Sequence, residues 1–388
     1  MDIKTISEFY EAVCAEYDIK INPDALHVLQ KAAATGNFTL KLSGNNRLRR
    51  VQRLSDADVL ALSKCLHNNK RVTGLDLRYN KIRDEGAEHL AELLQGNGSL
   101  LSLRLSGNKI GNRGAMYLAS MLQVNSSLQQ LELADCDLAT QSVIALSIVL
   151  KTNKALRSVD ISRPLLFSHQ EEWAVHFSEM LAVNSSLLEL HLGKVGMSDS
   201  GMERLTEGLR LNHSLRYLDL RCNRVTRDGV RRLAEVLKQD SALEVIDLSS
   251  NRIEDEGAAY LSEAIVVLYL TFCLRLSISS NNIWTEGLLS LAQAMKANTT
   301  LTHVYIWGNH LEEPVCQAFG ELLSSGRLPA EQTDVSAYEV DGRLFLAESP
   351  NGLRKHWFGS NGTNAALSSD ATLPPNMEQQ QQLAPLQF

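Results

Sequence analysis

The sequence predicts an α/β solenoid, curved like a horseshoe, of about ten units that each contain one short strand and one helix. Two observations predict this fold. The string LDLRYNKI, which begins at Leu75, recurs in related form at Leu103, Leu218 and Ile246, and self-similarity at a fixed period is typical of repeat proteins. Within each unit the apolar spacing changes from the alternation of a strand to the three-and-four spacing of a helix.

An asparagine closes most of the predicted strands and so measures the length of a unit. These residues are Asn80, Asn108, Asn223, Asn251, Asn281 and Asn309. The intervals from 80 to 108, from 223 to 251 and from 281 to 309 are each 28 residues, and the 115 residues from 108 to 223 hold three units of 28 and one of 31. Cys136, Pro164 and Val195 take the closing position in the irregular units.

The strand and helix halves of a unit each have one apolar side. In the strand, Leu75 and Leu77 face one way and Asp76 faces the other. In the helix that follows, apolar residues recur at i, i+3, i+4 and i+7. Neither side can be buried within one unit, so neighbouring units must stack. Strands stack about 4.8 Å apart and helices about 8–10 Å apart, so we expect parallel strands on the concave face and helices on the convex face.

The repeated pattern resembles the leucine-rich repeats of the ribonuclease-inhibitor-like class, L-x-x-L-x-L-x-x-N/C-x-L followed by a helix. The resemblance runs from about Leu40 to Leu323. It implies a horseshoe whose concave face binds other proteins. Ribonuclease inhibitor, the Ran GTPase-activating protein and the sensor ends of innate immune receptors share these repeats and do different things, so the fold alone leaves the function open.

Four segments are expected along the chain. Residues 1–38 form a helical N-terminal cap, for which a partner-docking helix is the alternative; residues 39–323 form the leucine-rich-repeat array. Residues 324–358 form a C-terminal cap with a β-hairpin, because the sequence alternates around Asp341-Gly342. Residues 359–388 are rich in Ser, Asn, Pro and Gln and are predicted to be disordered.

Two units depart from the pattern. The unit at 162–177 has three extra residues, which should bulge between strand and helix, with Trp173 packed beneath as a core aromatic or exposed as a contact. In the segment 264–274 an apolar run replaces a corner that is polar in other units. That run is compatible with a buried irregular corner, a partner surface or a variant junction.

Composition and motifs argue against several functional classes. The net charge of −7 disfavours binding to nucleic acid or to anionic membranes. The six cysteines are scattered and the N-terminus lacks an apolar signal region. We therefore expect an intracellular protein of the cytoplasm, the nucleus or both, and not a secreted one. The N-x-[ST] sequons fall at one corner of successive units, where a turn explains them.

No catalytic signature occurs in the sequence, and no His/Cys cluster has metal-ligand spacing. We expect no enzymatic activity, no cofactor and no metal. The glycines of the segment 106–114 resemble a phosphate loop but lack its Lys-Ser/Thr ending, and the repeat itself explains them.

The candidate binding residues are strand side chains that point away from the core. They are acidic in the middle of the arch and aromatic toward its C-terminal end, where exposed Tyr and Trp would be suited to a hot spot. The candidates are Asp76, Arg104, Glu132, Asp160, His191, Asp219, Arg221, Asp247, His303, Tyr305 and Trp307. The alternative is that Asp is simply common in strands of this class and that the C-terminal hairpin covers the aromatic side chains.

The leading hypothesis is a non-enzymatic scaffold or adaptor that binds a protein partner on the concave face. The competing hypothesis is a small-GTPase regulator, by resemblance to the Ran GTPase-activating protein. Such proteins carry a strongly acidic tail after the repeats, whereas this chain ends in Gln, Pro, Leu and Ala. Arg78 and Arg104 are the side chains that would face a nucleotide in that case.

Overall fold

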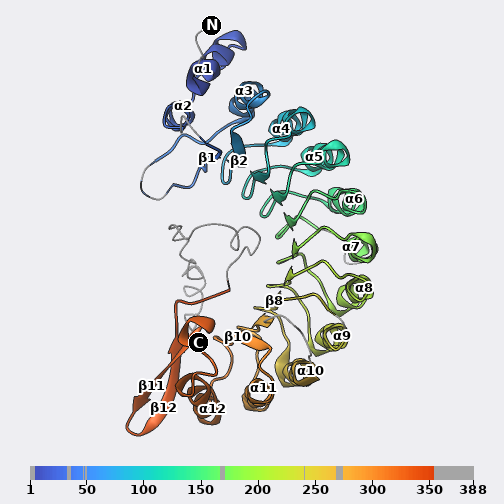
Figure 1. The fold of residues 1–388 in the computed structure, drawn as a ribbon, viewed down its shortest axis with the longest axis vertical. Coiled ribbons are helices and arrows are strands. Elements are labelled where there is room, and N and C mark those ends of the chain that lie inside the picture. The colour runs from blue at the N-terminus through green and yellow to red at the C-terminus, as the bar shows by residue number, and fades with distance from the viewer. Residues whose placement is uncertain are drawn as a thin grey trace, which may run out of the picture.

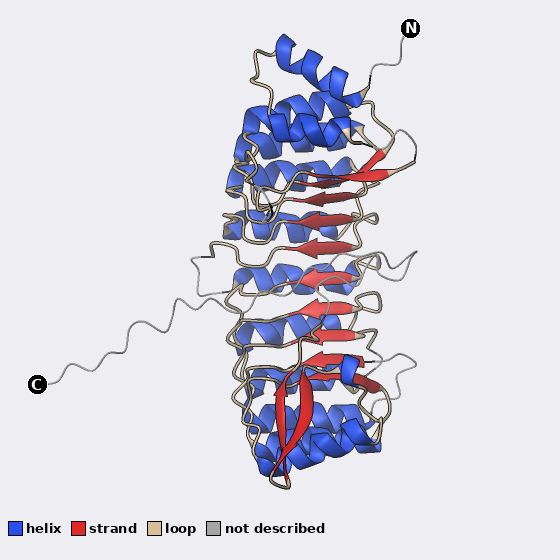
Figure 2. Ribbon diagram, turned by 90° about the vertical axis from the view of Figure 1, so that its left-hand side faces the viewer, coloured by secondary structure: helices blue, strands red, loops and turns tan. Residues whose placement is uncertain are grey.

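The computed structural model describes residues 5–32, 36–46, 48, 50–166, 171–239, 241–267 and 274–353. The described chain is a curved solenoid with its strands on the inner side and its helices on the outer side (Figure 1). Viewed from the inner side, the strands form a single stack (Figure 2). The predicted α/β horseshoe is therefore confirmed.

Ten strands form one parallel sheet in chain order, and two further strands form an antiparallel pair. The strands are β1 (Phe38–Lys41), β2 (Val72–Asp76), β3 (Ser102–Arg104), β4 (Gln130–Glu132), β5 (Ser158–Asp160), β6 (Glu189–His191), β7 (Tyr217–Asp219), β8 (Val245–Asp247), β9 (Leu274–Ser277), β10 (Leu301–Tyr305), β11 (Val335–Val340) and β12 (Arg343–Glu348). The ten parallel strands match the predicted number of units.

The helices of successive units pack side by side on the convex face. They are α3 (Asp56–Leu66), α4 (Asp84–Gly96), α5 (Asn112–Val124), α6 (Thr140–Leu150), α7 (Glu172–Val183), α8 (Asp199–Leu209), α9 (Arg227–Leu237), α10 (Glu254–Val267), α11 (Thr285–Ala297) and α12 (Glu313–Ser324). Helices α1 (Ile6–Glu16) and α2 (Pro23–Gln30) precede the first strand, and a 3₁₀ turn, η1 (Ala330–Gln332), follows α12. The core lies between the helices and the strands, where Leu75, Leu77 and Leu105 are buried.

The closing asparagines connect neighbouring units through buried amides. The Nδ2 group of Asn108 donates hydrogen bonds to the carbonyl oxygens of Leu77 (2.9 Å) and Leu105 (2.7 Å). Its Oδ1 accepts from the backbone N–H of Ile82 at 3.1 Å. Where a cysteine replaces the asparagine, Cys136 donates one weaker bond through Sγ to Leu105 at 3.4 Å. The closing asparagines of the repeat pattern therefore form a ladder of hydrogen bonds that joins neighbouring units.

A second asparagine ladder runs along the corner between helix and strand. Asn125, which opens a sequon, is 7% exposed and donates to the carbonyl oxygen of Leu94 at 2.7 Å. Asn184 does the same to Leu150 at 2.6 Å. Because these amides are buried and bonded, they act as structural turn residues, as the sequence indicates.

The acidic residue at the start of a helix caps the helix of the next unit. The Oδ1 atom of Asp199, in α8, accepts from the backbone N–H groups of Thr226 (2.8 Å) and Gly229 (3.0 Å) at the start of α9. These N–H groups lack partners within their own helix. A Cβ atom at Gly229 would lie 2.5 Å from that Oδ1, so the glycine permits the approach.

The two ends of the sheet carry additional elements. Helix α1 packs against α3, and Tyr10 of α1 is fully buried. At the other end, β11 and β12 pair antiparallel through the two-residue turn Asp341-Gly342, whose φ angles are 51° and 77°. The hairpin packs on α12 and lies on the inner side of the curve (Figures 1 and 2).

Two irregular units are only partly described. Trp173 is 1% exposed and packs edge-on to Phe177, with ring centroids 6.3 Å apart, so it is a core aromatic. Residues 167–170 lie outside the described residues. Within the segment 264–274, the described residues 264–267 end α10 and Leu274 begins β9; residues 268–273 and the predicted disordered tail at 359–388 also lie outside.

Candidate functional site

The candidate residues at the central strand position form one continuous row across the concave face, here called the concave row. The parallel pairing joins each member to the next in register. The row comprises Asp76, Arg104, Glu132, Asp160, His191, Asp219, Asp247, Ser277 and Tyr305. Residues far apart in the sequence therefore share one surface.

The N-terminal half of the concave row is locked by Arg–carboxylate pairs. Arg78 binds Asp76 in a two-pronged manner, with Nε to Oδ1 at 2.9 Å and Nη2 to Oδ2 at 2.7 Å. On the next two strands, Nε of Arg104 lies 3.1 Å from Oε1 of Glu132. The side chain of Gln130 donates to the same Oε1 at 2.9 Å. The two arginines proposed to face a nucleotide are therefore each engaged by a carboxylate.

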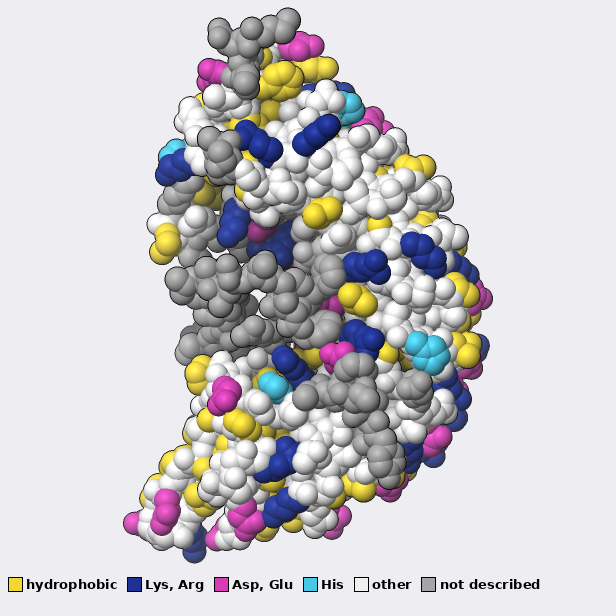
Figure 3. Space-filling view, in the orientation of Figure 1, with side chains coloured by type: hydrophobic (Ala, Val, Ile, Leu, Met, Phe, Trp, Pro, Cys, Tyr) yellow, Lys and Arg dark blue, Asp and Glu magenta, His cyan; other side chains and the backbone are white. Residues whose placement is uncertain are grey.

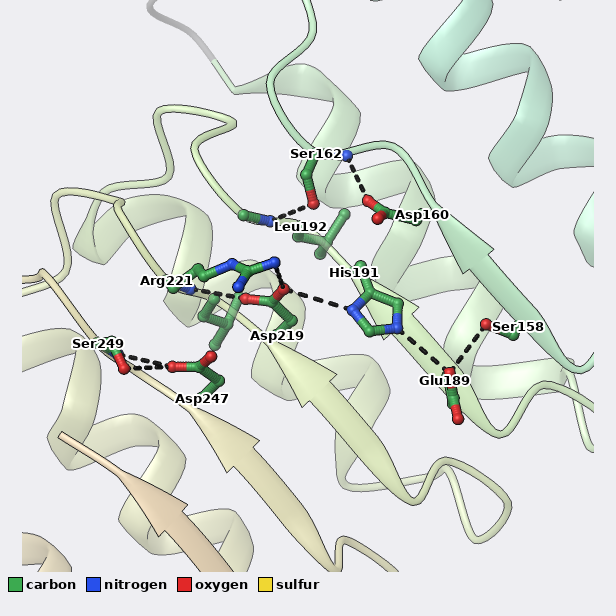
Figure 4. Close-up of polar contacts among 12 residues, drawn as sticks. Ser158, Asp160, Ser162, Glu189, His191, Leu192, Asp219, Arg221, Asp247 and Ser249 are labelled. Atoms are coloured by element: carbon green, nitrogen blue, oxygen red, sulfur yellow. Dashed lines mark hydrogen bonds and ion pairs between the residues drawn. The ribbon is translucent and has the colours of Figure 1, made fainter. Parts of the chain in front are cut away.

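A histidine bridges two carboxylates in the middle of the row (Figure 4). Nδ1 of His191 lies 3.3 Å from Oδ2 of Asp219, and Nε2 lies 3.3 Å from Oε2 of Glu189. The hydroxyl of Ser158 donates to the same Oε2 at 2.9 Å. Burial opposes the charged form of His191, but the bonds to Asp219 and Glu189 outweigh it and raise its pKa to about 10. The imidazolium therefore donates from both nitrogens at neutral pH.

The neighbouring carboxylate on β8 has a different set of partners. Oδ1 of Asp247 accepts from the hydroxyl of Ser249 at 2.6 Å and from its backbone N–H at 3.0 Å. Arg221 instead pairs with Asp219, Nη2 to Oδ2 at 3.1 Å. Burial, followed by the negative charge of Asp219, raises the pKa of Asp247 to about 6. The charges of Asp219 and Asp247 raise the pKa of Arg221 against the opposing effect of burial.

The C-terminal end of the face is aromatic and closes onto the segment after α12. Tyr305 is buried and Trp307 is partly buried. The hydroxyl of Thr302 is 2.8 Å from Nδ1 of His303. Burial, followed by the positive charge of Arg275, lowers the pKa of His303 to about 4. This imidazole is therefore neutral at neutral pH, unlike His191.

The exposure of the candidates differs from the sequence-based expectation. Strand alternation predicts that they project into solvent, but Glu132, Asp160, His191 and Asp219 are at most 1% exposed and Tyr305 is 5% exposed. Strands about 4.8 Å apart hold their polar side chains against one another, and the ion pairs along the row draw them closer. The concave face is therefore a layer of buried polar side chains that are hydrogen-bonded or ion-paired to one another.

The row of strand residues that precedes the concave row by two positions is not among the sequence-predicted candidates. Glu189, a partner of His191, belongs to it, as do Gln130 and Ser158. Extending the strand alternation by one step toward the N-terminus would have found them. Asp334, whose carboxylate accepts hydrogen bonds from the backbone N–H groups of Ile306 and Trp307 at the edge of the sheet, has no counterpart in the repeats and therefore gives no such signal.

The described residues contain no group of three or more His, Cys, Asp or Glu side chains arranged to hold a metal ion. In the same part of the chain, no helix has both the length and the apolar character that crossing a membrane requires. A cavity of about 660 Å³ lies between α12 and the hairpin; Gly320, Leu323, Ala337 and Leu344 are among its lining residues.

The match to a protein-family model agrees with the repeat architecture. A model of the Leucine Rich repeat family matches residues 68–91, 96–119, 124–147, 211–234 and 241–262. Among solved structures, the actin-binding site 2 of leiomodin-1 is 19% identical, covers 40% of this chain and 89% of its own, and has a TM-score of 0.34.

Curated relatives match along nearly the whole chain. Leucine-rich repeat-containing protein 34 of Homo sapiens is 48% identical over 94% of this chain and 86% of its own length. The protein of the same name from Mus musculus is 49% identical over 90% of this chain and 92% of its own, and that from Rattus norvegicus is 47% identical over 92% and 94%. With this identity along nearly its whole length, the chain belongs to the family of leucine-rich repeat-containing protein 34.

Proposed function

We propose that this chain is a non-enzymatic scaffold that binds a protein partner on its concave face, in the cytoplasm, the nucleus or both. The observation that carries the proposal is the continuous register of the concave row across strands β2 to β10. A row of this kind presents fixed donors and acceptors along one curved surface. Concave strand faces of solenoids are extended binding surfaces.

Pre-organisation supports this surface as a binding site. The His191 bridge and the Arg78 and Arg104 pairs hold their side chains in one arrangement before any partner arrives. A surface whose rotamers are already fixed loses less conformational entropy on binding. The anchors for a partner would be Trp307 at one end and, in the middle, the guanidinium of Arg221, which is 33% exposed and held by Asp219.

The convex face is a less suitable surface. There, acidic and basic side chains are intermingled along the outer rim (Figure 3). Many of them pair between neighbouring helices, as Arg232 does with Glu203 at 2.8 Å and Lys151 with Glu179 at 2.7 Å. Exposed pairs of this kind contribute little energy and give no stretch of one sign for a partner to recognise.

The test is affinity capture with matched variants of the full chain. The double variant Asp219→Asn/Asp247→Asn changes the concave face, and Glu235→Gln makes the same chemical change on the exposed side of α9. Partners of the concave face should be retained by the wild type and by Glu235→Gln, and lost by the double variant. A capture profile that the concave substitutions leave unchanged would refute the proposal.

The GTPase-regulator alternative requires a separate measurement. Multiple-turnover hydrolysis by a panel of small GTPases, with and without the chain, tests it directly. We expect no acceleration, because Arg78 and Arg104 are engaged by Asp76 and Glu132. Acceleration that Arg78→Ala or Arg104→Ala abolishes would instead favour the regulator.

A further inference from the structure

The hairpin at the C-terminal end of the solenoid has one exposed strand, β11. Helix α12 packs mainly against β12, where Leu346 is buried and a Cβ atom at Gly320 would collide with the side chain of Leu344. On β11, every residue from 336 to 340 is exposed. Native proteins usually cover a strand edge or protect it with lysine, proline or a bulge. The sequence VSAYEV of β11 contains neither residue, and its pairing with β12 is regular.

The turn of the hairpin determines which backbone groups of β11 point away from β12. Val340 and Arg343 flank the two-residue turn and therefore form a hydrogen-bonded pair. Hydrogen-bonded and non-hydrogen-bonded pairs alternate along an antiparallel ladder. Ala337 and Glu339 occupy the non-hydrogen-bonded positions, so their N–H and C=O groups point outward. An added strand could pair with both residues.

A cavity of about 660 Å³ lies beside this edge. Ser336 and Ala337 both line it, and because neighbouring residues of a strand point to opposite faces, the cavity lies at the edge of β11. Gly320 and Leu323 of α12 and Leu344 of β12 are further lining residues. A strand added to β11 would therefore place alternate side chains in a largely apolar cavity, whose volume is within the range of about 300–1,000 Å³ for ligand pockets.

The opposite face of the hairpin is aromatic. Tyr338 is 48% exposed and Phe345 is 39% exposed, and their rings stack with centroids 5.7 Å apart. Side chains at paired positions of neighbouring strands lie side by side, so the other alternate side chains of an added strand would lie beside Tyr338. A lysine or arginine there could contact the face of the ring, which attracts cations.

This end of the chain is also acidic. Residues 312–353 contain eight acidic and two basic side chains, a net charge of −6 in a chain whose total is −7. Glu321 pairs with Lys296 at 2.7 Å, whereas Glu331 and Glu339 are exposed and pair with no basic side chain of the described residues. The charge therefore favours a basic occupant and disfavours a second copy of this chain, which has the same acidic end.

We propose that the outer edge of β11 binds an extended basic segment of another protein by strand addition, with apolar side chains in the cavity beside α12 and cationic side chains beside Tyr338. Backbone hydrogen bonds to Ala337 and Glu339 supply affinity, and the cavity selects every second side chain. The acidic surroundings attract the segment. This site shares no residue with the concave row and therefore goes beyond the proposed function.

The test uses a fluorescein-labelled peptide of alternating lysine and valine, KVKVKVK, capped at both ends. Its fluorescence anisotropy with the full-length chain reports binding, which we expect for the wild type. Ala337→Pro removes one outward N–H, a change that an edge strand tolerates. It should weaken binding at least about fivefold, as the loss of one backbone hydrogen bond predicts. Gln317→Trp on α12 fills the cavity and should weaken binding similarly, whereas Gln123→Trp, at an exposed position of α5, should not.

Controls on the peptide leave the protein unchanged. The peptide KVKPKVK keeps the charge but lacks the central N–H, and it should bind at least about fivefold more weakly. The peptide EVEVEVE should not bind. Glu331→Gln/Glu339→Gln should weaken binding of KVKVKVK about two- to fivefold, as the loss of exposed charge pairs predicts, and Glu235→Gln should not. Melting curves show whether Ala337→Pro folds; if it does not, Gln317→Trp and the proline peptide still test the site.

Four outcomes would overturn the proposal. The first is no binding of KVKVKVK to the wild type at millimolar concentration. Equal binding of KVKPKVK would show adsorption of a cation on an acidic surface without strand addition. Loss of peptide binding in Asp219→Asn/Asp247→Asn would place the peptide on the concave face. Wild-type dimers that Ala337→Pro dissociates would make a second copy the occupant. The scaffold proposal is tested by the concave substitutions in affinity capture, so either proposal can fail without the other.

Discussion

The carboxylate of Asp334 accepts a hydrogen bond of 2.7 Å from the backbone N–H of Ile306, just beyond the last strand of the sheet. Its second oxygen accepts from the backbone N–H of Trp307 at 3.1 Å and from the hydroxyl of Ser279 at 2.7 Å. In earlier units the N–H at the position of Ile306 bonds to a carbonyl oxygen of the next unit, as that of Leu105 does to Glu132 at 2.8 Å. A side chain therefore takes the place of the missing strand.

Replacing Asp334 should destabilise the C-terminal end of the array. Asp334→Ala leaves the N–H groups of Ile306 and Trp307 without acceptors in a largely buried place, and each such loss costs about 1–3 kcal/mol. We expect a loss of about 2–5 kcal/mol in the free energy of unfolding, measured by urea denaturation. Glu331→Ala, an exposed acidic residue three positions earlier, should change stability by less than about 0.5 kcal/mol. Equal effects of the two variants would contradict the capping role.

Removing one amide from the asparagine ladder should also be costly. Asn108 is 1% exposed and joins Leu77, Ile82 and Leu105. Asn108→Ala should cost about 2–4 kcal/mol, because two carbonyl oxygens and one N–H lose a partner. Asn108→Cys should recover part of this loss, since Cys136 occupies the equivalent position naturally. The exposed Lys109→Ala is the control, and thermal melts with matched van't Hoff analysis would rank the three variants.

Most of the fold could be predicted from the sequence because each unit repeats the same physical requirement. The strand leucines such as Leu105 and the closing asparagines recur at a fixed interval, and both proved to be buried. The regular spacing also predicts that the members of the concave row lie in register on neighbouring strands. Because the same strand and helix pattern occurs in about ten units, each unit is a separate test of the predicted fold. A globular domain without repeats offers only one such test.

The details of the site depend on contacts between units, which the pattern of one unit does not contain. The bridge from Glu189 through His191 to Asp219 joins two strands separated by 28 residues. The cap by Asp334 comes from a segment outside the repeats. The burial of Tyr305 likewise depends on its spatial neighbours. Alternation predicts which face a side chain occupies, but its partners on that face depend on the identities of residues in adjacent units.

The two concave histidines should have opposite pH behaviour. For His303, burial and then the charge of Arg275 lower the pKa to about 4, against an opposing effect of Glu331. The unfolded chain, with a His pKa near 6.5, binds a proton that the folded chain rejects as the pH falls from 6.5 to 4. This histidine therefore reduces stability progressively in that window. Urea denaturation at pH 7.0, 5.5 and 4.5 should show a flatter pH dependence for His303→Gln than for wild type.

The change in pH dependence caused by His303→Gln has an upper limit, and His191→Gln is its control. The difference in slope should remain below about 1.4 kcal/mol per pH unit, the limit for one proton. The pKa of His191 is instead raised to about 10, so this residue stabilises the fold below pH 6.5 and loses that contribution only as the pH rises toward 10. His191→Gln should accordingly leave the slope between pH 6.5 and 4 almost unchanged. Identical slopes for His303→Gln and wild type would contradict the assignment.

The cysteines should fall into distinct reactivity classes. Burial raises the pKa of both Cys65 and Cys136 to about 12, so few of these thiols are ionised at pH 8. Cys222 is exposed. A disulfide-exchange reagent added to the native chain at pH 8 should modify Cys222 within seconds to minutes and should reach Cys65 and Cys136 only on unfolding. Mass mapping would identify the sites, and Cys222→Ser should remove that fast label. Rapid labelling of Cys136 in the native state would show that its unit opens.

The last prediction concerns whether the concave row behaves as one network. Arg104 lies 3.1 Å from a carboxylate of Glu132 that is 2% exposed, whereas Arg113 lies 3.8 Å from Glu88 in a pair that is 66% and 32% exposed. Removing a cation beside a buried carboxylate should cost about 1–3 kcal/mol, but breaking an exposed pair should cost less than about 1 kcal/mol. Arg104→Ala should therefore melt well below Arg113→Ala, and Glu132→Gln added to Arg104→Ala should restore part of the stability, because the buried charge is then absent as well. A double-mutant cycle in urea measures this coupling. If both arginine variants melt alike and the cycle is additive, the row is a set of independent side chains, and the pre-organisation argued for partner binding does not exist.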